Sequence, residues 1–188
     1  MREGFTFKVI PIVNPYGYAN NTRNNARNVN INRNFAPFFN IQSDADKGAS
    51  PYSENESLIV HNWMAANPGC YAYFDIHDTY VSSGTRSYHE SPNVSLMRAY
   101  CSLIRSLSSM WHRNYGFGSD GKVLGYVDFA VHGNTFNEAF FVHKILNSAL
   151  FECGDFDDTG HETADVMYAG YELVANYLNM IMSKCWTD

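Results

Sequence analysis

The segment from Cys70 to Ile76, which predicts a buried strand, leads directly into His77. Strands of an α/β sheet present functional groups at their carboxyl ends, and a neutral imidazole there is a good zinc ligand. Asp75 stands two residues earlier on the same face, where it would orient the second ring nitrogen. A hydrogen-bonded histidine and a local salt bridge are the alternatives that the residues leave open. The position of His77 at the end of the predicted strand makes it a candidate metal ligand.

An asparagine- and arginine-rich stretch, residues 20–34, contains the candidates for binding an anion. Its eight asparagines and three arginines resist both helix and strand, so a long ordered loop that ends at Phe35 is expected. Asn32 and Arg33 suit a carboxylate, because a guanidinium offers a planar fork and a neighbouring amide adds a donor. Adjacent strand residues face opposite ways, so these two converge only where the chain leaves a strand. A solvated loop is the alternative.

Glu138 is the candidate for general acid and base chemistry. The stretch from Thr135 to Val142 predicts a strand, on which Glu138 lies between Phe136 and Phe140 on one face. Such an apolar setting suits a carboxylate that exchanges protons with a substrate. A buried glutamate paired with an arginine is the alternative interpretation.

The elements that must position these residues alternate between strands and helices. Ser53 to Glu56 forms a capping box ahead of a predicted helix over residues 54–66. No internal repeat or linker interrupts the chain, which predicts a single α/β domain over residues 1–188 with a mixed central sheet sandwiched by helices. The other predicted elements are a strand from Phe5 to Val13 that ends in a turn at residues 14–17, and helices over residues 92–114, 126–131 and 162–183.

Composition excludes some classes of function. The net charge of -6 over 188 residues leaves no basic stripe for a phosphate backbone, so nucleic acid is not an expected partner. The four cysteines are widely spaced and form no zinc-ribbon pair. No apolar run is long enough to span a bilayer and no signal-peptide core is visible, so a soluble chain is expected and its compartment is not indicated.

Three blocks, in this order, resemble zinc metallocarboxypeptidases of the carboxypeptidase A kind. They are Asn14-Pro15-Tyr16-Gly17 with Arg23 and then Asn30 to Phe35; Asp75-Ile76-His77; and Thr135-Phe136-Asn137-Glu138. Order and approximate spacing match over most of the chain, although Tyr16 and Asn30 stand where that family usually has aspartates. The resemblance implies a carboxypeptidase-like (phosphorylase/hydrolase-like) fold and a zinc-dependent metalloprotease that removes C-terminal residues from peptides.

The resemblance also implies roles for single residues. His77 would bind the zinc ion, and Glu138 would take a proton from the zinc-bound water and give it to the leaving amine. The oxyanion would be held by Arg23, which fits the family spacing better than its competitor Arg27, and the terminal carboxylate by Asn32 with Arg33. Tyr115, flanked by glycines, is preferred over Tyr126 as the tyrosine that closes over the substrate, and Val127 would lie near the specificity pocket.

One part of the family's metal site is not found in the sequence. The family binds zinc through H-x-x-E and a later histidine, and no H-x-x-E occurs here. The other ligands are therefore expected upstream of Met1, the fold is expected to be N-terminally incomplete, and the chain alone is expected to bind zinc weakly and to lack peptidase activity. A truncated enzyme and a natural short relative both fit this pattern.

Two other functions remain open. A deacylase of the aspartoacylase and succinylglutamate desuccinylase type shares the fold and similar Asn-Arg and Asp-x-His blocks, and would act on an N-acyl amino acid. A metal-free structural module could still bind a carboxylate through Asn32 and Arg33. Substrates with a free carboxylate are common to all three interpretations.

Overall fold

The computed structural model describes residues 6–77, 87–91, 93, 95, 126–127, 133–153, 175 and 178–182. The chain divides into unit 1, which comprises Met1–Asn67 and His132–Asn134, and unit 2, which comprises Pro68–Val131 and Thr135–Asp188. The expectation of a single domain stays a prediction. None of the described helices is long and apolar enough to span a membrane.

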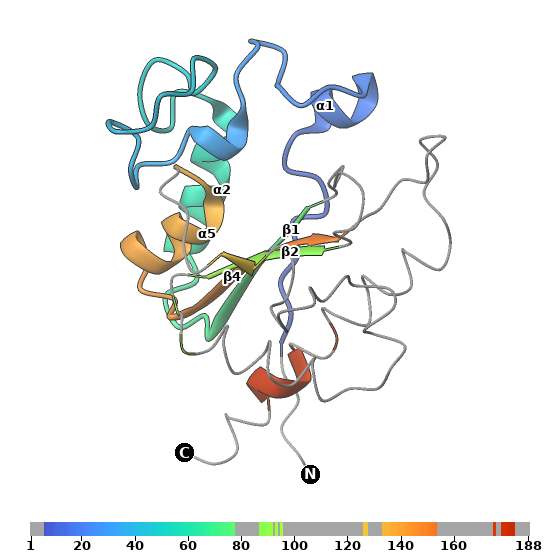
Figure 1. Cartoon of the computed structure of the whole chain (residues 1–188), viewed down its shortest axis with the longest axis vertical. Coiled ribbons are helices and arrows are strands. Elements are labelled where there is room, and N and C mark those ends of the chain that lie inside the picture. The colour runs from blue at the N-terminus through green and yellow to red at the C-terminus, as the bar shows by residue number, and fades with distance from the viewer. Residues whose placement is uncertain are drawn as a thin grey trace, which may run out of the picture. The chain divides into compact units, whose positions relative to one another are not determined.

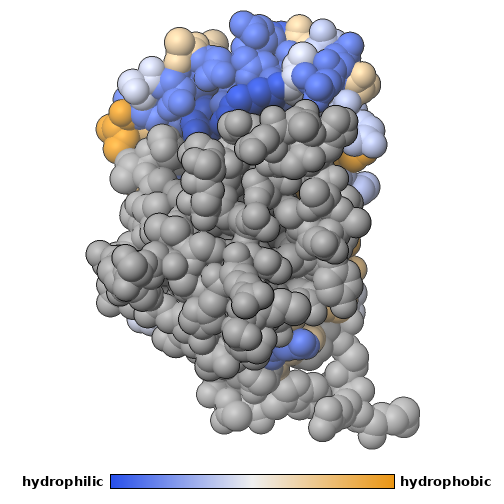
Figure 2. Space-filling model, turned by 45° about the vertical axis from the view of Figure 1, so that its right-hand side comes forward, coloured by the Kyte–Doolittle hydropathy of each residue, from blue (hydrophilic) through white to orange (hydrophobic). Residues whose placement is uncertain are grey.

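Unit 1 consists of short helices joined by long ordered loops (Figure 1). Its elements are α1 (Pro15–Asn20), the 3-10 turn η1 (Ile31–Arg33) and α2 (Asn55–Ala65). The large apolar side chains buried in this unit are Phe35, Phe39, Val60 and Met64. Figure 2 shows a largely hydrophilic surface over the described part at the top of the molecule, where Figure 1 places the loops of this unit. The prediction of a long ordered loop before Phe35 is confirmed, with η1 at its end.

The strand predicted from Phe5 to Val13 is wrong for the described residues of this segment. Residues 6–13 lie outside any strand, and Phe7 and Val9 are 61% and 75% exposed. A strand needs a partner for its backbone hydrogen bonds, and no described strand of the chain pairs with this segment. The predicted turn at Asn14 is instead the start of α1, because the Asn14 side chain accepts from Gly17 N at 2.9 Å and Pro15 fits the first helical position.

Helix α2 confirms the helix expected over residues 54–66, but it is capped differently from the prediction. Its N-cap is Glu54, and the cap makes no side-chain hydrogen bond to the helix. The Ser53 hydroxyl donates to Glu54 Oε1 at 2.9 Å, and Asn34 Oδ1 accepts from Glu54 N at 3.2 Å. A side chain distant in sequence therefore takes the place of the capping box.

Unit 2 contains a mixed four-stranded sheet with the strand order β1-β4-β2-β3. Strand β1 (Ala72–His77) pairs in parallel with β4 (Asn147–Cys153). Strand β2 (Ser87–Glu90) pairs antiparallel with β4 and parallel with β3 (Tyr126–Val127). Helix α5 (Thr135–Asn137) runs into the π-helical η2 (Glu138–Val142), and α5 packs against β1 and β4. The mixed sheet and the strand before His77 are confirmed.

The strand predicted from Thr135 to Val142 is wrong, because these residues form α5 and η2. A short apolar run does not distinguish a strand from a buried helix by periodicity alone. The strand that enters the core is β4, in which Ala149, Leu150 and Phe151 are at most 2% exposed. Burial on both faces fits a central strand, and the Phe151 ring lies 6.2 Å from that of Phe74 on β1.

The other three predicted helices lie only partly within the described residues. Tyr126 and Val127 form the strand β3 and not the start of a helix, because they pair with β2. Residues 178–182 are helical, as the predicted helix over residues 162–183 requires. The predicted helix over residues 92–114 lies almost entirely outside the described residues.

Candidate functional site

His77 lies at the carboxyl end of β1 and contacts Asp75. His77 Nε2 is 2.8 Å from Asp75 Oδ1, and the two side chains are 27% and 13% exposed. Because residues i and i+2 of a strand share a face, the local backbone brings the carboxylate to the ring. The Thr135 hydroxyl, from α5, donates to Asp75 Oδ2. The contact between Asp75 and His77 is therefore present, as both the orienting role and a local salt bridge require, and a helix residue holds the other carboxylate oxygen.

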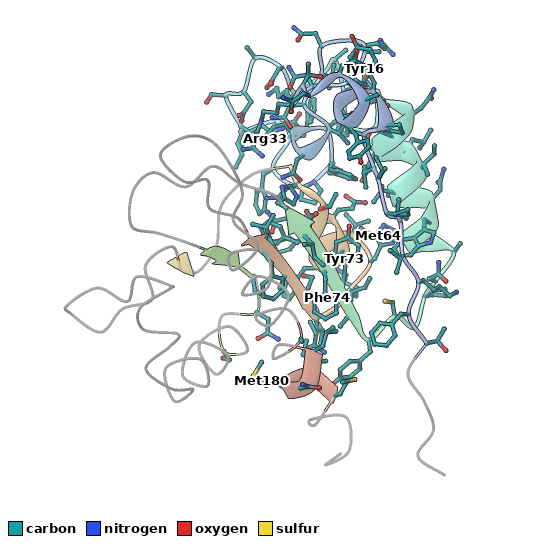
Figure 3. The ribbon with its side chains drawn as sticks, turned by 90° about the vertical axis from the view of Figure 1, so that its right-hand side faces the viewer. Tyr16, Arg33, Met64, Tyr73, Phe74 and Met180 are labelled. Atoms are coloured by element: carbon teal, nitrogen blue, oxygen red, sulfur yellow. The ribbon has the colours of Figure 1, made fainter. Side chains whose placement is uncertain are left out.

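Tyr73, labelled in Figure 3, stands two residues before Asp75 on the same face of β1, and Asp75 and Thr135 both act on its phenol. Loss of hydration raises the pKa of its phenol above the ordinary range, and the charge of Asp75 raises this pKa further. A hydrogen bond with Thr135 acts in the opposite direction. Tyr73 is therefore a neutral hydrogen-bonding group at physiological pH.

The register of the sheet places a second acidic residue at the level of His77. Strands β1 and β4 are parallel, and Glu152 is the register partner of His77. Parallel strands present their carboxyl ends at one edge of a sheet, so both residues stand at that edge. Sequence reasoning missed Glu152. The available signal was the apolar run from Ala149 to Phe151 ahead of it, which resembles the run that precedes His77.

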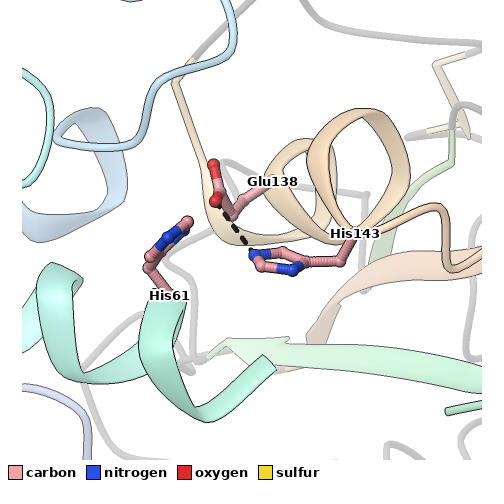
Figure 4. A group of neighbouring side chains, drawn as sticks. All are labelled: His61, Glu138 and His143. Atoms are coloured by element: carbon pink, nitrogen blue, oxygen red, sulfur yellow. Dashed lines mark hydrogen bonds and ion pairs between the residues drawn. The ribbon is translucent and has the colours of Figure 1, made fainter. Parts of the chain in front are cut away.

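Glu138 is fully buried and is paired with a histidine (Figure 4). Its Oε1 is 3.2 Å from Nε2 of His143, whose side chain is 11% exposed. The backbone N–H of His143 donates to the Glu138 carbonyl at 3.3 Å. The π-helical backbone brings residues five apart onto one side, which an ordinary helix would not do. A carboxylate and an imidazole are also donors that bind divalent cations, so unit 2 holds a second set of candidate ligands.

Asn32 and Arg33 lie together on the 3-10 turn η1, where the chain has left any extended conformation. The expected departure from strand geometry is confirmed. Arg33 Nε is 3.1 Å from Asp44 Oδ1, and its Nη1 donates to the carbonyl of Asn32 at 2.8 Å. The Arg33 side chain is only 16% exposed. The sequence had not indicated Asp44 as a partner.

The arginines proposed to hold an oxyanion are on the surface of unit 1. Arg23 is exposed, and its carbonyl accepts from Asn14 Nδ2 at 3.3 Å. The Arg27 side chain is 70% exposed and lies 3.7 Å from Glu54. An oxyanion-binding cation acts most strongly where water is excluded, so unit 1 by itself does not give Arg23 that setting. Tyr115 lies outside the described residues.

Residues 2–94 match a protein family that is described only as a protein of unknown function (DUF2817). This match covers Arg23, Asn32, Arg33 and His77, whereas Glu138 and Glu152 lie beyond it. No curated protein matches the sequence.

Proposed function

We propose that the chain has the chemistry of a metal-dependent hydrolase of the carboxypeptidase type, which acts on substrates with a free carboxylate. The observation that carries this proposal is the contact of His77 with Asp75 at the carboxyl end of β1. An imidazole whose second nitrogen lies on a carboxylate is the usual arrangement of a zinc ligand. The parallel pairing of β1 with β4 is compatible with a carboxypeptidase-like fold, which forms part of the proposal.

The contacts of His77 fit the role of one zinc ligand. Because Nε2 contacts Asp75, the ring would bind the metal through Nδ1. Asp75 would hold the ring in the orientation that leaves Nδ1 for the metal, and Thr135 holds Asp75 through its other oxygen. A zinc ion bound here would act as a Lewis acid and lower the pKa of a bound water.

Two glutamates of unit 2 are candidates for the general base. The pairing of β1 with β4 supports Glu152, because this residue is the register partner of His77 near the carboxyl ends of both strands. Glu138 has the support of the sequence resemblance, and its carboxylate is buried against His143. A base must take a proton from water and later release it to the leaving group. We favour Glu152 because its backbone position is tied to that of His77.

Asn32 and Arg33 supply the proposed recognition of a carboxylate in unit 1. Arg33 is held by two acceptors of its own unit, and a guanidinium offers further N–H donors to a planar anion. The same recognition would serve the C-terminal carboxylate of a peptide or the carboxylate of an N-acyl amino acid.

A calorimetric titration of the whole chain with zinc tests the metal site. His77→Ala should weaken zinc binding at least tenfold, and His143→Ala serves as the matched exchange at the second candidate ligand set. If the His143→Ala exchange abolished binding and the His77→Ala exchange left it unchanged, the metal assignment would be wrong.

Hydrolysis assays distinguish the possible reactions. The zinc-loaded chain, with Glu152→Gln and Glu138→Gln as variants, is offered an N-blocked dipeptide and an N-acyl amino acid. Cleavage of the dipeptide alone supports a carboxypeptidase, and cleavage of the N-acyl amino acid alone supports a deacylase. Binding of either carboxylate without turnover is the result expected when the other zinc ligands lie outside this chain, and it is also the behaviour of a non-catalytic module. Loss of turnover in only one of the two glutamine variants identifies the base.

A further inference from the structure

We propose that Asp44 is a positioning residue, which holds the Arg33 guanidinium by its Nε edge so that its outer end is presented to a ligand carboxylate. This inference rests on the proposed function, and it adds a residue that neither motif nor resemblance indicates. Both residues belong to unit 1, and Asp44 Oδ1 lies 3.1 Å from Arg33 Nε.

The contacts of the guanidinium account for only part of its donor capacity. Nε faces Asp44, and Nη1 donates to the Asn32 carbonyl at 2.8 Å. Among the residues that the structure describes, no acceptor of a hydrogen bond from Nη2 is found. A guanidinium has five N–H groups in a rigid plane, so two fixed acceptors determine the direction of the remaining ones. The end formed by the two Nη atoms is the part left for a bidentate anion.

The loop that carries Asp44 is fastened to the turn that carries Arg33. Asn30 N donates to the Asp46 carbonyl at 2.8 Å, and the Gln42 side-chain amide donates to the Arg33 carbonyl. Lys47 Nζ donates to the Gln42 carbonyl at 2.7 Å. These bonds flank Asp44 on both sides. The loop backbone on both sides of Asp44 is therefore fixed by contacts that do not involve the Arg33 guanidinium.

Fixing the side chain before a ligand arrives makes binding tighter. A free arginine loses rotamer freedom when it binds, and this loss weakens binding by roughly two- to tenfold for one side chain. Arg33 is already held at two atoms in the absence of any ligand. Asp44 also offsets the positive charge of a side chain that is only 16% exposed.

An NMR titration of the ¹⁵N-labelled chain tests the proposal, with N-benzoylglycine as the carboxylate probe and its amide as the neutral control. Asp44→Ala should weaken probe binding about three- to tenfold and shift the Arg33 Nε–H resonance. Asp44→Asn keeps an acceptor oxygen at the same place and should restore both the resonance and most of the affinity. Asp46→Ala removes the same charge from the same loop, but no side-chain bond of Asp46 to a described residue is found, so binding should stay within about twofold.

The outcomes separate this inference from the function on which it rests. If Arg33→Ala leaves probe binding unchanged, the carboxylate site of the proposed function is wrong. If Arg33→Ala abolishes binding and Asp44→Ala binds as tightly as the wild type or more tightly, Asp44 competes with the ligand and the positioning role is refuted. If the Asp44→Ala protein does not fold, Asp44→Glu takes its place, because it displaces the carboxylate oxygen while keeping the charge. An affinity for the probe equal to that of the wild type in Asp44→Glu also refutes the positioning role.

Discussion

Replacement of Asn34 by alanine should strongly destabilise the protein. Its side chain is fully buried and forms the centre of the hydrogen-bond network in unit 1. Its Nδ2 donates to the carbonyls of Lys47 and Ser50 at 2.7 and 3.0 Å and to Ser53 Oγ at 3.0 Å. Its Oδ1 accepts from Glu54 N at 3.2 Å and Ser57 Oγ at 2.6 Å. The amide therefore links the turn η1 to the start of α2 and to the loop before it.

The magnitude follows from these contacts. An amide nitrogen has two hydrogens, so the three Nδ2 contacts amount to two full hydrogen bonds, and the carbonyl oxygen adds two more. At about 1 kcal/mol of net stability for each bond, Asn34→Ala should cost roughly 3–5 kcal/mol. The carbonyls of Lys47 and Ser50 are then left without this donor. That loss is a large share of the roughly 5–15 kcal/mol by which a typical protein is stable.

Urea unfolding followed by circular dichroism measures this loss. Asn34→Asp has the same shape but places an oxygen against the carbonyls of Lys47 and Ser50, so it should cost at least as much as the alanine variant. The matched control is Asn20→Ala, whose side chain makes one exposed bond to the Tyr16 carbonyl at 2.9 Å and should cost below about 1 kcal/mol. An Asn34→Ala protein within 1 kcal/mol of wild type would refute the network as a source of stability.

Three further predictions concern unit 2. Thr135→Val removes the hydroxyl that donates to Asp75, so zinc affinity measured by calorimetry should fall severalfold, and an unchanged affinity would count against the role of this contact. The folded protein holds the Tyr73 proton more tightly than the unfolded chain, whose phenol has the ordinary pKa of 10.0. The stability that results is present below that pH and is lost as the pH rises above it, so Tyr73→Phe should show a shallower alkaline loss in urea titrations. His143→Ala takes a donor from the buried Glu138 carboxylate and should cost about 1–3 kcal/mol, with the Glu138→Gln, His143→Ala double variant losing less than the sum.

The parts of the fold that the sequence predicted correctly are those with a local cause. The strand ending at His77 is a short β-rich run that stops at polar residues, and α2 buries Ser57, Val60 and Met64, which stand at helical spacing. The contact of Asp75 with His77 follows from strand geometry within three residues. These features depend on neighbouring residues, so one sequence is enough to infer them.

The parts that it did not predict depend on pairing over long distances. The position of Glu152 beside His77 requires the register of two strands more than 60 residues apart in the chain, which no local pattern contains. Residues 135–142 were predicted to be a strand of the sheet but are helical. The strand of this region that pairs with β1 and β2 is β4, and this pairing is a long-range feature. Likewise, the pairing of Asp44 with Arg33 depends on the path of the loop between them.

The choice of asparagine around the proposed carboxylate site has a physical reason. The loop needs residues that tolerate left-handed backbone, and Asn21 and Asn28 adopt φ of 51° and 61°. It must also satisfy buried backbone groups, and an amide can donate and accept at once, as Asn34 does. Further carboxylates besides Asp44 could accept the same N–H groups, but each would add negative charge near Arg33 and weaken its attraction for an anion. An asparagine-rich loop therefore supplies rigidity without adding negative charge to that of Asp44.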